Sequence, residues 1–451
     1  MSGARGPVSE LGRGLVHLGA GFLALTLKVL TVPQAALLAA LAVVFNYAVL
    51  ARIGGGRLFR DGERRAPLDS GIQLYPFAVL LLVLLFGWRP EVAAAGWVIM
   101  AAGDPAARAA GRTFGRRPLP WNGAKTCAGS AAFALAAGLA STGILVYMGR
   151  PPSEAALLAV PTALFAAFVE SLPWRLNDNL TVPLLSALFL CGLVGARVER
   201  LPEILPAMGE PLLQAVAVNL VLAVAFRNAG TVDRSGMVAG FAVGTLTWTL
   251  GGWRAFAILI AFFVLGSGTT RLGRRRKERL GVAQAKHGAR SARHALANCG
   301  VGVYLTALAT TAPVPGLYLL AFVCAYATAA FDTVSSEIGQ AWGGRPVMIT
   351  TLRPVPIGTD GAVSLVGTLA GFAAAAAVGS IAVALGLVGP AALAIVLVAA
   401  FVGSSADSFL GATLERRGLM DNDAVNFSNT LIGALSGMGG ALLAGGLMAP
   451  R

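Results

Sequence analysis

The chain has 451 residues, of which 56% are hydrophobic and only 12% are charged. An average soluble domain carries about 25% charged residues, and the mean hydropathy of this chain is +0.73, so the composition argues against a soluble globular protein. The formal charge is +14, but nucleic acid is not an expected partner because no soluble basic domain is present to bind it.

Apolar runs recur along the whole chain at the length that a bilayer-spanning helix requires. They predict an all-α, polytopic transmembrane bundle of about fifteen helices. The first half contributes spans at residues 14–30, 35–51, 71–88, 91–103, 126–148, 155–170 and 182–196. A helix at 211–226 follows, and then spans at 236–250, 253–270, 295–311, 314–331, 362–386, 388–404 and 427–447. No small-residue cleavage site follows the first apolar run, so we expect a membrane span there and not a secretory signal.

Basic residues gather in three segments, at residues 52–65, 108–125 and 271–293. With residue 1 in the cytoplasm, all three fall on the cytoplasmic side, as the positive-inside rule expects. The same segments could seat phosphates or anionic lipid head groups, and the two interpretations are compatible. We therefore expect an integral protein of the plasma (inner) membrane. Its polar loops, at 104–125, 171–181, 332–361 and 405–426, should form active sites on the cytoplasmic face. Few spans carry a mid-helix charge, which favours an enzyme over a carrier.

Two patterns occur twice in the chain. Residues 104–118 and 332–346 share D-x6-G-x3-G-x-R-P, and E-x6-N-D begins at Glu170 and again at Glu415. In each half the second pattern lies two helices beyond the first. This duplication predicts two parallel seven-helix repeats, which we place in two membrane domains at residues 1–200 and 210–447.

The residue types shared by the two copies are Asp, Glu, Asn, Arg and Gly. Carboxylate and amide oxygens at a water-facing edge suit Mg²⁺, which keeps several waters and takes phosphate oxygens as ligands. Arginine and lysine match phosphate charge, and glycine lets backbone N–H groups approach phosphates. These residues suit phosphoryl or nucleotidyl transfer. Taken singly, each of them could equally cap a helix or pair within a loop.

Three segments of the first half carry a family resemblance: GLVHLGAG at 14–21, GDPAARAAGRTFGRRPLPWNGAKTCAGS at 103–130 and ESLPWRLNDNLTVP at 170–183. They resemble the polyprenol kinase family, which includes dolichol kinase and phytol kinase and, more distantly, phosphatidate cytidylyltransferase. The resemblance implies CTP as phosphate donor and a divalent metal. It carries function onto Asp104, Lys125, Thr126, Glu170, Asn177, Asp178 and Asn179.

Four segments of the second half carry a second family resemblance: FDTVSSEIG at 331–339, PVPIGTDGAVSLVGT at 354–368, ADSFLGATLE at 406–415 and NDAVNFSNTLIGAL at 422–435. They resemble the membrane family called domain of unknown function 92, which includes plant phytyl-phosphate kinase. Asn298 and Gly300 also fit that family. Asp360 departs from it, because the family's stretch has Asn at this position.

Residue types and resemblance together give a set of candidate roles. The catalytic candidates are Asp104, Lys125, Asp178, Asp332 and Asp423. The nucleotide- or phosphate-binding candidates are Gly111, Gly115, Arg117, Thr126, Asn298, Gly339, Gly343, Arg345, Arg353, Gly358, Thr359 and Gly361. The metal ligands are expected among Asp104, Asn177, Asp178, Asp332, Asp407, Asn422, Asp423 and Asn426. The supporting residues are Glu170, Asn179, Glu337 and Glu415.

The two resemblances together suggest successive phosphorylations of a membrane isoprenoid. The first half would convert a prenyl alcohol (phytol-like) to its monophosphate, and the second would convert the monophosphate to the diphosphate. Mg²⁺ is expected to bridge CTP to Asp104 with Asp178 in one half, and to Asp332 with Asp423 in the other. Two alternatives stay open: a CDP-lipid-forming cytidylyltransferase and a non-enzymatic lipid-phosphate transporter. ATP as donor also stays open.

Overall fold

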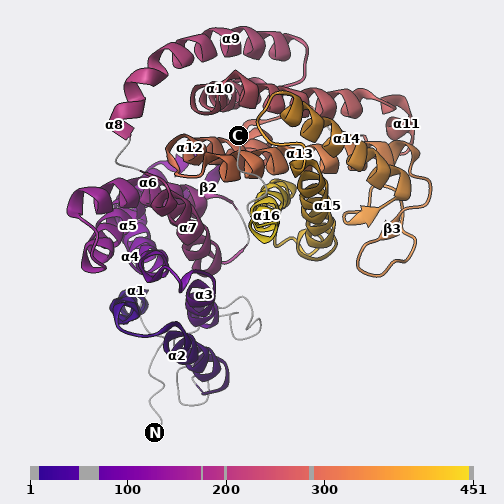
Figure 1. Ribbon diagram of the computed structural model, residues 1–451. Coiled ribbons are helices and arrows are strands. Elements are labelled where there is room, and N and C mark those ends of the chain that lie inside the picture. The colour runs from indigo at the N-terminus through magenta and orange to yellow at the C-terminus, as the bar shows by residue number, and fades with distance from the viewer. Residues whose placement is uncertain (1–9, 50–70, 174–175, 198–200, 284–288, 446–451) are drawn as a thin grey trace. The chain divides into compact units, whose positions relative to one another are not determined.

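The computed structural model of the protein describes residues 10–49, 71–173, 176–197, 201–283 and 289–445 (Figure 1). It confirms a polytopic helical membrane protein, because the only strands within these ranges form two short hairpins. Nine helices within the same ranges are long and apolar enough to cross a bilayer. The chain divides into two compact units, Met1–Glu199 and Arg200–Arg451, which we describe separately as unit 1 and unit 2.

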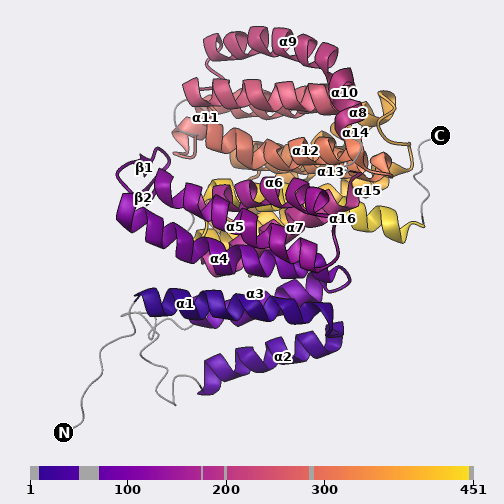
Figure 2. The same cartoon turned by 90° about the vertical axis from the view of Figure 1, so that its left-hand side faces the viewer.

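Unit 1 is built from seven α-helices within its described residues and one hairpin. The helices are α1 (Glu10–Gly21), extended by the 3₁₀ turn η1 (Phe22–Lys28), α2 (Val32–Val44), extended by the π turn η2 (Phe45–Val49), α3 (Gly71–Phe86), α4 (Pro90–Phe114), α5 (Cys127–Tyr147), α6 (Pro152–Ser171) and α7 (Asp178–Gly195). The strands β1 (Pro118–Leu119) and β2 (Asn122–Thr126) form an antiparallel hairpin between α4 and α5. In Figure 2, α2 lies on one side of α1 and α3, and α4 to α6 lie on the other.

Unit 2 begins with α8 (Leu201–Ile204) and the 3₁₀ turn η6 (Leu205–Met208). Its further elements are α9 (Gly209–Asn228), α10 (Arg234–Arg271), α11 (Arg274–Arg279), α12 (Ala292–Thr311), α13 (Pro315–Trp342), the hairpin of β3 (Val347–Met348) and β4 (Ala362–Val363), α14 (Leu365–Ala384), α15 (Ala392–Leu410), the π turn η8 (Gly411–Glu415) and α16 (Asn422–Leu443). Gly252 interrupts α10 with a positive φ of 73°. Both spans predicted at 236–250 and 253–270 therefore lie within α10.

Small side chains let the helices of unit 2 pack closely around α13. Its residues from Leu320 to Phe331 are all buried, and alanine recurs through this stretch. Alanine and glycine contribute little apolar area, but they allow neighbouring backbones to approach, which is how membrane helices gain contact in lipid.

The two hairpins join helix pairs with the same local geometry. Thr126 caps α5 by accepting a hydrogen bond from the Gly129 N–H at 3.1 Å, and Ser364 caps α14 by accepting one from the Gly367 N–H at 3.2 Å. Counting from the shared aspartates, Gly103 of α4 corresponds to Phe331 of α13, and counting from the caps, Phe133 of α5 corresponds to Gly371 of α14.

This Gly–Phe contact occurs in both units, but with the partners exchanged. A Cβ placed on Gly103 would lie 2.6 Å from the Phe133 ring, and one placed on Gly371 would lie 2.6 Å from the Phe331 ring. Both phenylalanines are buried. The units therefore share this local helix–hairpin–helix element, while two parallel seven-helix repeats stay a prediction.

All four predicted polar loops are partly helical, so their predicted boundaries were wrong. In the loop predicted at 171–181, α7 already begins at Asp178. The helix α4 continues to Phe114, α13 continues to Trp342, and α15 continues to Leu410. Asp104, Asp332 and Asp407 therefore lie inside helices. Hydropathy falls at these positions, but the Ala-rich segment at the end of α4 keeps good helix propensity, and in all three helices the loss of the apolar pattern did not mark the helix end.

Candidate active site

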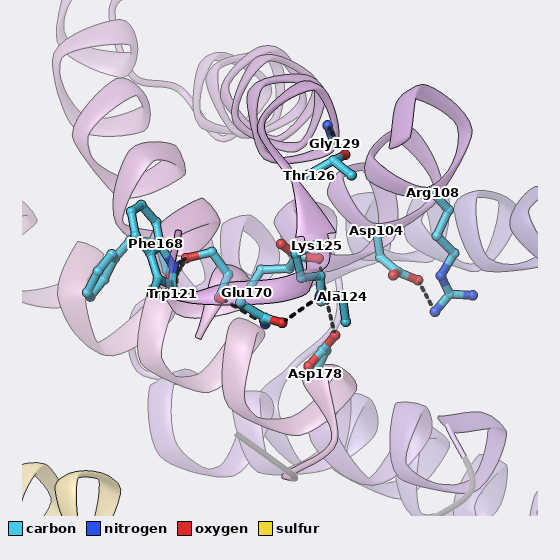
Figure 3. Close-up of polar contacts among 12 residues, drawn as sticks. Asp104, Arg108, Trp121, Ala124, Lys125, Thr126, Gly129, Phe168, Glu170 and Asp178 are labelled. Carbon is cyan, nitrogen blue, oxygen red and sulfur yellow. Dashed lines mark hydrogen bonds and ion pairs between the residues drawn. The ribbon is translucent and has the colours of Figure 1, made fainter. Parts of the chain in front are cut away.

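Lys125 holds the central position in a polar cluster of unit 1 (Figure 3). Its Nζ lies 2.5 Å from Glu170 Oε1 and 3.0 Å from Asp178 Oδ2. The lysine comes from β2, the glutamate from the last turn of α6, and the aspartate from the first residue of α7. Burial alone would lower the pKa of Lys125, but the charges of Asp178 and Glu170 outweigh it and raise that pKa. The lysine is therefore held as a cation between two carboxylates.

Asp104 lies beside this lysine cluster on α4. It is 7% exposed, and its Oδ2 lies 2.8 Å from the guanidinium of Arg108, one helical turn further on. The charges of Asp178 and Lys125 also act on Asp104. The structure thus brings together three residues that the sequence assigned to one site, and it adds Arg108, which the prediction had left out.

The tip of the β1–β2 hairpin is attached to the end of α6. Trp121 Nε1 donates to Ser171 Oγ at 3.1 Å, and Asn122 Nδ2 donates to the Ser171 carbonyl oxygen at 3.0 Å. Ser171 directly follows Glu170, so these bonds fix the register in which Lys125 meets that glutamate. Sequence reasoning missed all three residues, because about fifty residues separate the hairpin from its partner and no periodic pattern links them.

The predicted phosphate-binding glycines lie where two helices touch. A Cβ on Gly111 would lie 3.3 Å from Thr126 Oγ1, and one on Gly129 would lie 3.1 Å from the carbonyl oxygen of Ala107. In unit 2, Gly339 and Gly367 make the equivalent close approach around Ser364, and Gly343 lies against the same serine. Helix packing and capping account for the spacing of these residues, and a phosphate-binding role for them stays a prediction.

A cavity of about 1490 Å³ lies within unit 1 beside the Lys125 cluster. Its walls come mainly from α1, α2, α3 and α4 and are mostly apolar, with Leu27, Leu38 and Val79 among them. Its charged and amide-bearing walls include Asp104, Arg108, Arg112, Asn177, Asp178 and Asn179. The volume exceeds the roughly 300–1,000 Å³ of pockets for drug-sized ligands, so a long apolar molecule with a polar head would fit.

In unit 2, the carboxyl groups of Asp332 on α13 and Asp407 on α15 lie within hydrogen-bonding reach of each other. Ser404 Oγ donates to Asp332 Oδ1 at 3.3 Å, and Asn429 Nδ2 donates to Asp407 Oδ1 at 3.3 Å. Within the described ranges, no lysine, arginine or histidine forms an ion pair with either carboxylate. Asn429 is fully buried, and its Oδ1 has no hydrogen-bond partner among the residues that the structure describes.

Asp423 lies in a different environment from the one expected. Its Oδ2 is 3.2 Å from Arg293 Nε, and Asp421, the N-cap of α16, also accepts a hydrogen bond from Arg293. Burial raises the pKa of Asp423, and the Arg293 charge lowers it in part. The structure therefore gives Asp332 a different carboxylate neighbour, Asp407, and pairs Asp423 with an arginine. The E-x6-N-D pattern falls one residue differently on the two helices, because α16 begins at Asn422 whereas α7 begins at Asp178.

Glu337, predicted as a supporting residue, forms a buried ion pair with Lys277 of α11. Lys277 also donates to the carbonyl oxygens of Thr269 and Thr270 at 3.2 and 2.9 Å. The one sequence signal for this buried lysine is its position as a single lysine inside a run of arginines.

The remaining predicted residues lie at helix ends, in buried helix positions or on exposed loops. Asn177 caps α7, Asn179 Nδ2 donates to the Gly71 carbonyl oxygen at 3.2 Å, and Asn298 Nδ2 donates to the His294 carbonyl oxygen at 3.0 Å. Asn426 is buried in α16, and Glu415 of η8 faces Asp360 and Asp407. The exposed predicted arginines are Arg117, Arg345 and Arg353. Thr359 lies between Gly358 and Gly361, which have φ of 84° and 77°.

The metal prediction has uneven support in the two units. No group of three His, Cys, Asp or Glu side chains within the described ranges has an arrangement that would hold a metal by itself. Mg²⁺ needs only one or two carboxylates when phosphates and waters complete its shell. The Asp332–Asp407 pair fits that requirement, because it lacks a cation and lies beside the orphaned amide oxygen of Asn429. Asp104 and Asp178 fit less well, because each is already paired with a cation.

Helix composition and buried carboxylate clusters define a polytopic membrane protein with polar sites within and between its helices. A family model described as "Integral membrane protein DUF92" matches residues 217–434. An uncharacterized membrane protein of Synechocystis sp. is 34% identical over 238 residues, which is 52% of this chain and 92% of that protein. The chain therefore belongs to the integral membrane protein DUF92 family, and the predicted resemblance of its second half is confirmed.

Two plant proteins are also similar to the chain. "Protein VTE6, chloroplastic" of Arabidopsis thaliana is 36% identical over 211 residues, covering 45% of this chain and 63% of that protein. "Probable phytol kinase 3, chloroplastic" of Glycine max is 33% identical over 198 residues, covering 40% of this chain and 61% of that protein. The chain thus spans less than two thirds of either plant protein. No solved structure matches the chain.

Proposed function

We propose that the protein is a membrane isoprenoid kinase, in which unit 1 phosphorylates a prenyl alcohol. The observation that carries the proposal is the apolar cavity of unit 1, whose polar wall includes Asp104, Arg108 and Asp178 and adjoins Lys125. An isoprenoid needs an apolar channel for its tail and a charged end where its hydroxyl meets a phosphate donor. The similarity to a probable phytol kinase supports the same substrate class.

The residues of unit 1 suit phosphoryl transfer, which depends mainly on positioning and on charge stabilisation. Lys125, oriented by Glu170 and Asp178, supplies a fixed cation against the charge that develops on the transferred phosphoryl group. Arg108 and Arg112 line the same cavity and can neutralise the other phosphates. Asp104 lies on the cavity wall, where its carboxylate is placed to act on the polar head of a bound substrate.

For the donor we propose CTP, by resemblance to the polyprenol kinases, with Mg²⁺ as the metal. Mg²⁺ would neutralise phosphate charge and hold the phosphates in line. In unit 2, the residues that would hold it are Asp332, Asp407 and Asn429. In unit 1, the expected pair is Asp104 and Asp178, each of which would have to exchange a cation contact for the metal.

We further propose that unit 2 phosphorylates the monophosphate to the diphosphate, with both sites on the cytoplasmic face of the plasma membrane. The duplicated helix–hairpin–helix scaffold supports a second site of related chemistry. One chain carrying both units would keep the intermediate at high effective concentration.

The test uses purified full-length protein with Mg²⁺, a panel of prenyl alcohols and monophosphates, and either CTP or ATP at equal concentration. Products are identified by mass. A kinase releases CDP, whereas a cytidylyltransferase releases pyrophosphate and a transporter consumes no nucleotide. If no alcohol or monophosphate gains a phosphoryl group with either donor, the proposed function is wrong.

A further inference from the structure

The basic run after α10 is folded into a defined element. Gly273 takes a left-handed conformation (φ 67°), which ends α10 in a turn, and α11 follows at once. There is no room for a side chain at this turn, because a Cβ on Gly273 would lie 2.8 Å from the Trp342 ring and 3.1 Å from the Ala341 methyl group. The turn therefore sets α11 directly against the end of α13.

One of the six residues of α11 points inward and anchors the helix. Lys277 is 2% exposed, and its ammonium pairs with Glu337 and donates to two carbonyl oxygens in the last turn of α10. A buried ion pair has a large desolvation cost and often adds little net stability. A charged loop that acts only as a topology signal needs no such anchor, since the positive-inside rule depends on the number of cations and not on their conformation.

The anchor leaves the other cations of α11 on the surface. Arg275, Arg276 and Arg279 are exposed, and none of them forms an ion pair with a described residue. Exposed apolar side chains flank them: Leu272 is 54%, Leu280 45% and Trp342 40% exposed. Arginines beside leucine and tryptophan at the ends of spanning helices match the boundary between head groups and acyl chains.

We propose that α11 is a docking surface for anionic phospholipids of the surrounding membrane. Three guanidinium groups held on one short helix can contact lipid phosphates, and Leu272, Leu280 and Trp342 can enter the acyl boundary beside them. Charge complementarity selects this occupant, because the surface carries three cations that form no ion pair with any residue the structure describes. Its one carboxylate, Glu278, is already bound by Arg274 at 2.7 Å. The inference does not depend on the kinase proposal.

The experiment titrates purified full-length protein in detergent with phosphatidylglycerol or phosphatidylcholine and counts retained lipids by native mass spectrometry. The test variant is R275Q/R276Q/R279Q, and R275K/R276K/R279K keeps the charge. Each surface cation is worth about five-fold in affinity for anionic lipid. The glutamine variant should therefore bind phosphatidylglycerol roughly 100-fold more weakly, while the lysine variant stays within a few-fold of the parent. Binding of phosphatidylcholine should not change.

A single-site comparison controls for net charge. R276Q should weaken phosphatidylglycerol binding, whereas R254Q, which removes an exposed arginine at the Gly252 break of α10, should not. All the variants change exposed residues, so thermal unfolding should confirm that each of them is folded. The proposal fails if the glutamine variant retains phosphatidylglycerol as the parent does, or if the parent binds both lipids equally. It also fails if Mg²⁺-CTP displaces the lipid, because α11 would then be a nucleotide site.

Discussion

The Lys125 cluster makes a sharp prediction about the first phosphorylation step. Replacing Lys125 alone would leave Glu170, whose side chain is 5% exposed, facing Asp178 without a cation. Removing one partner of a fully buried ion pair costs about 3–5 kcal/mol. The Lys125 side chain is 29% exposed, so the cost here is smaller, but a loss of stability would still confuse the result. The better perturbation is Lys125→Met together with Glu170→Gln, because it removes one charge of each sign and leaves only the 42% exposed Asp178.

The expected magnitude follows from the role proposed for the lysine. A fixed cation or donor aimed at transition-state charge is worth about 10²–10³ in rate. The double variant should therefore lose at least about 100-fold in alcohol phosphorylation. Because the charge change is balanced, we expect a stability loss of only about 1–2 kcal/mol. Phosphorylation of the monophosphate, which is proposed for unit 2, should be retained.

A matched control is available in the same unit. Arg150 lies 2.5 Å from Glu154 and 3.2 Å from Glu91, so Arg150→Met with Glu154→Gln removes the same charges away from the cavity. The assay measures prenyl monophosphate formation by mass, with CTP and Mg²⁺. If the Lys125 variant keeps a third or more of the parent rate, or if the control loses as much, the assigned role of Lys125 is refuted.

Four further predictions follow from the two units. The charges of Asp178 and Glu170 raise the pKa of Lys125, so the lysine loses its charge only as pH rises through that raised pKa. Glu170→Gln removes one of these charges and should move the alkaline limb of kcat/KM to lower pH. An unchanged alkaline limb would argue against a role for the Lys125 charge in the reaction. Asp332→Asn or Asp407→Asn should abolish phosphorylation of the monophosphate but spare that of the alcohol, and equal loss of both steps would favour one composite site. Excess EDTA should abolish both phosphorylation steps, and full activity in EDTA would show that neither step requires a divalent metal. Cysteines placed at Gly281 and Gly344 should be labelled from the cytoplasm, and one placed at Pro152 should be labelled from outside. Labelling of all three from a single side would refute the topology. A fourth predicted position, Gly55, lies outside the described residues.

The sequence predicted the helical membrane class because hydropathy is a property of local windows, which a single chain contains in full. It also predicted that Asp104, Lys125 and Asp178 share a site, because the family motifs place them in order along the chain. The duplication was visible for the same reason, since its spacing is fixed within short segments.

The side-chain contacts in unit 2 could not be predicted from the sequence in the same way. Asp332 and Asp407 come from helices whose facing sides are decided by packing, and no spacing rule links residues so far apart. The buried position of Lys277 depends on a left-handed glycine that turns a basic run inward, whereas composition alone places that run in water. Asn429 was missed because a buried asparagine in a small-residue helix gives no signal until its neighbours are known.

The exchanged Gly–Phe contact has a consequence for how the chain assembles during synthesis. The helix α4 is synthesised long before α14, so helices of one unit could pair with the wrong helices of the other unit during synthesis. Pairing α13 with α5 would bring Phe331 against Phe133, and pairing α4 with α14 would leave Gly103 facing Gly371 across an empty space. One mispairing is blocked by collision and the other lacks packing contacts, so two similar helix–hairpin–helix elements can fold in the same membrane without exchanging helices.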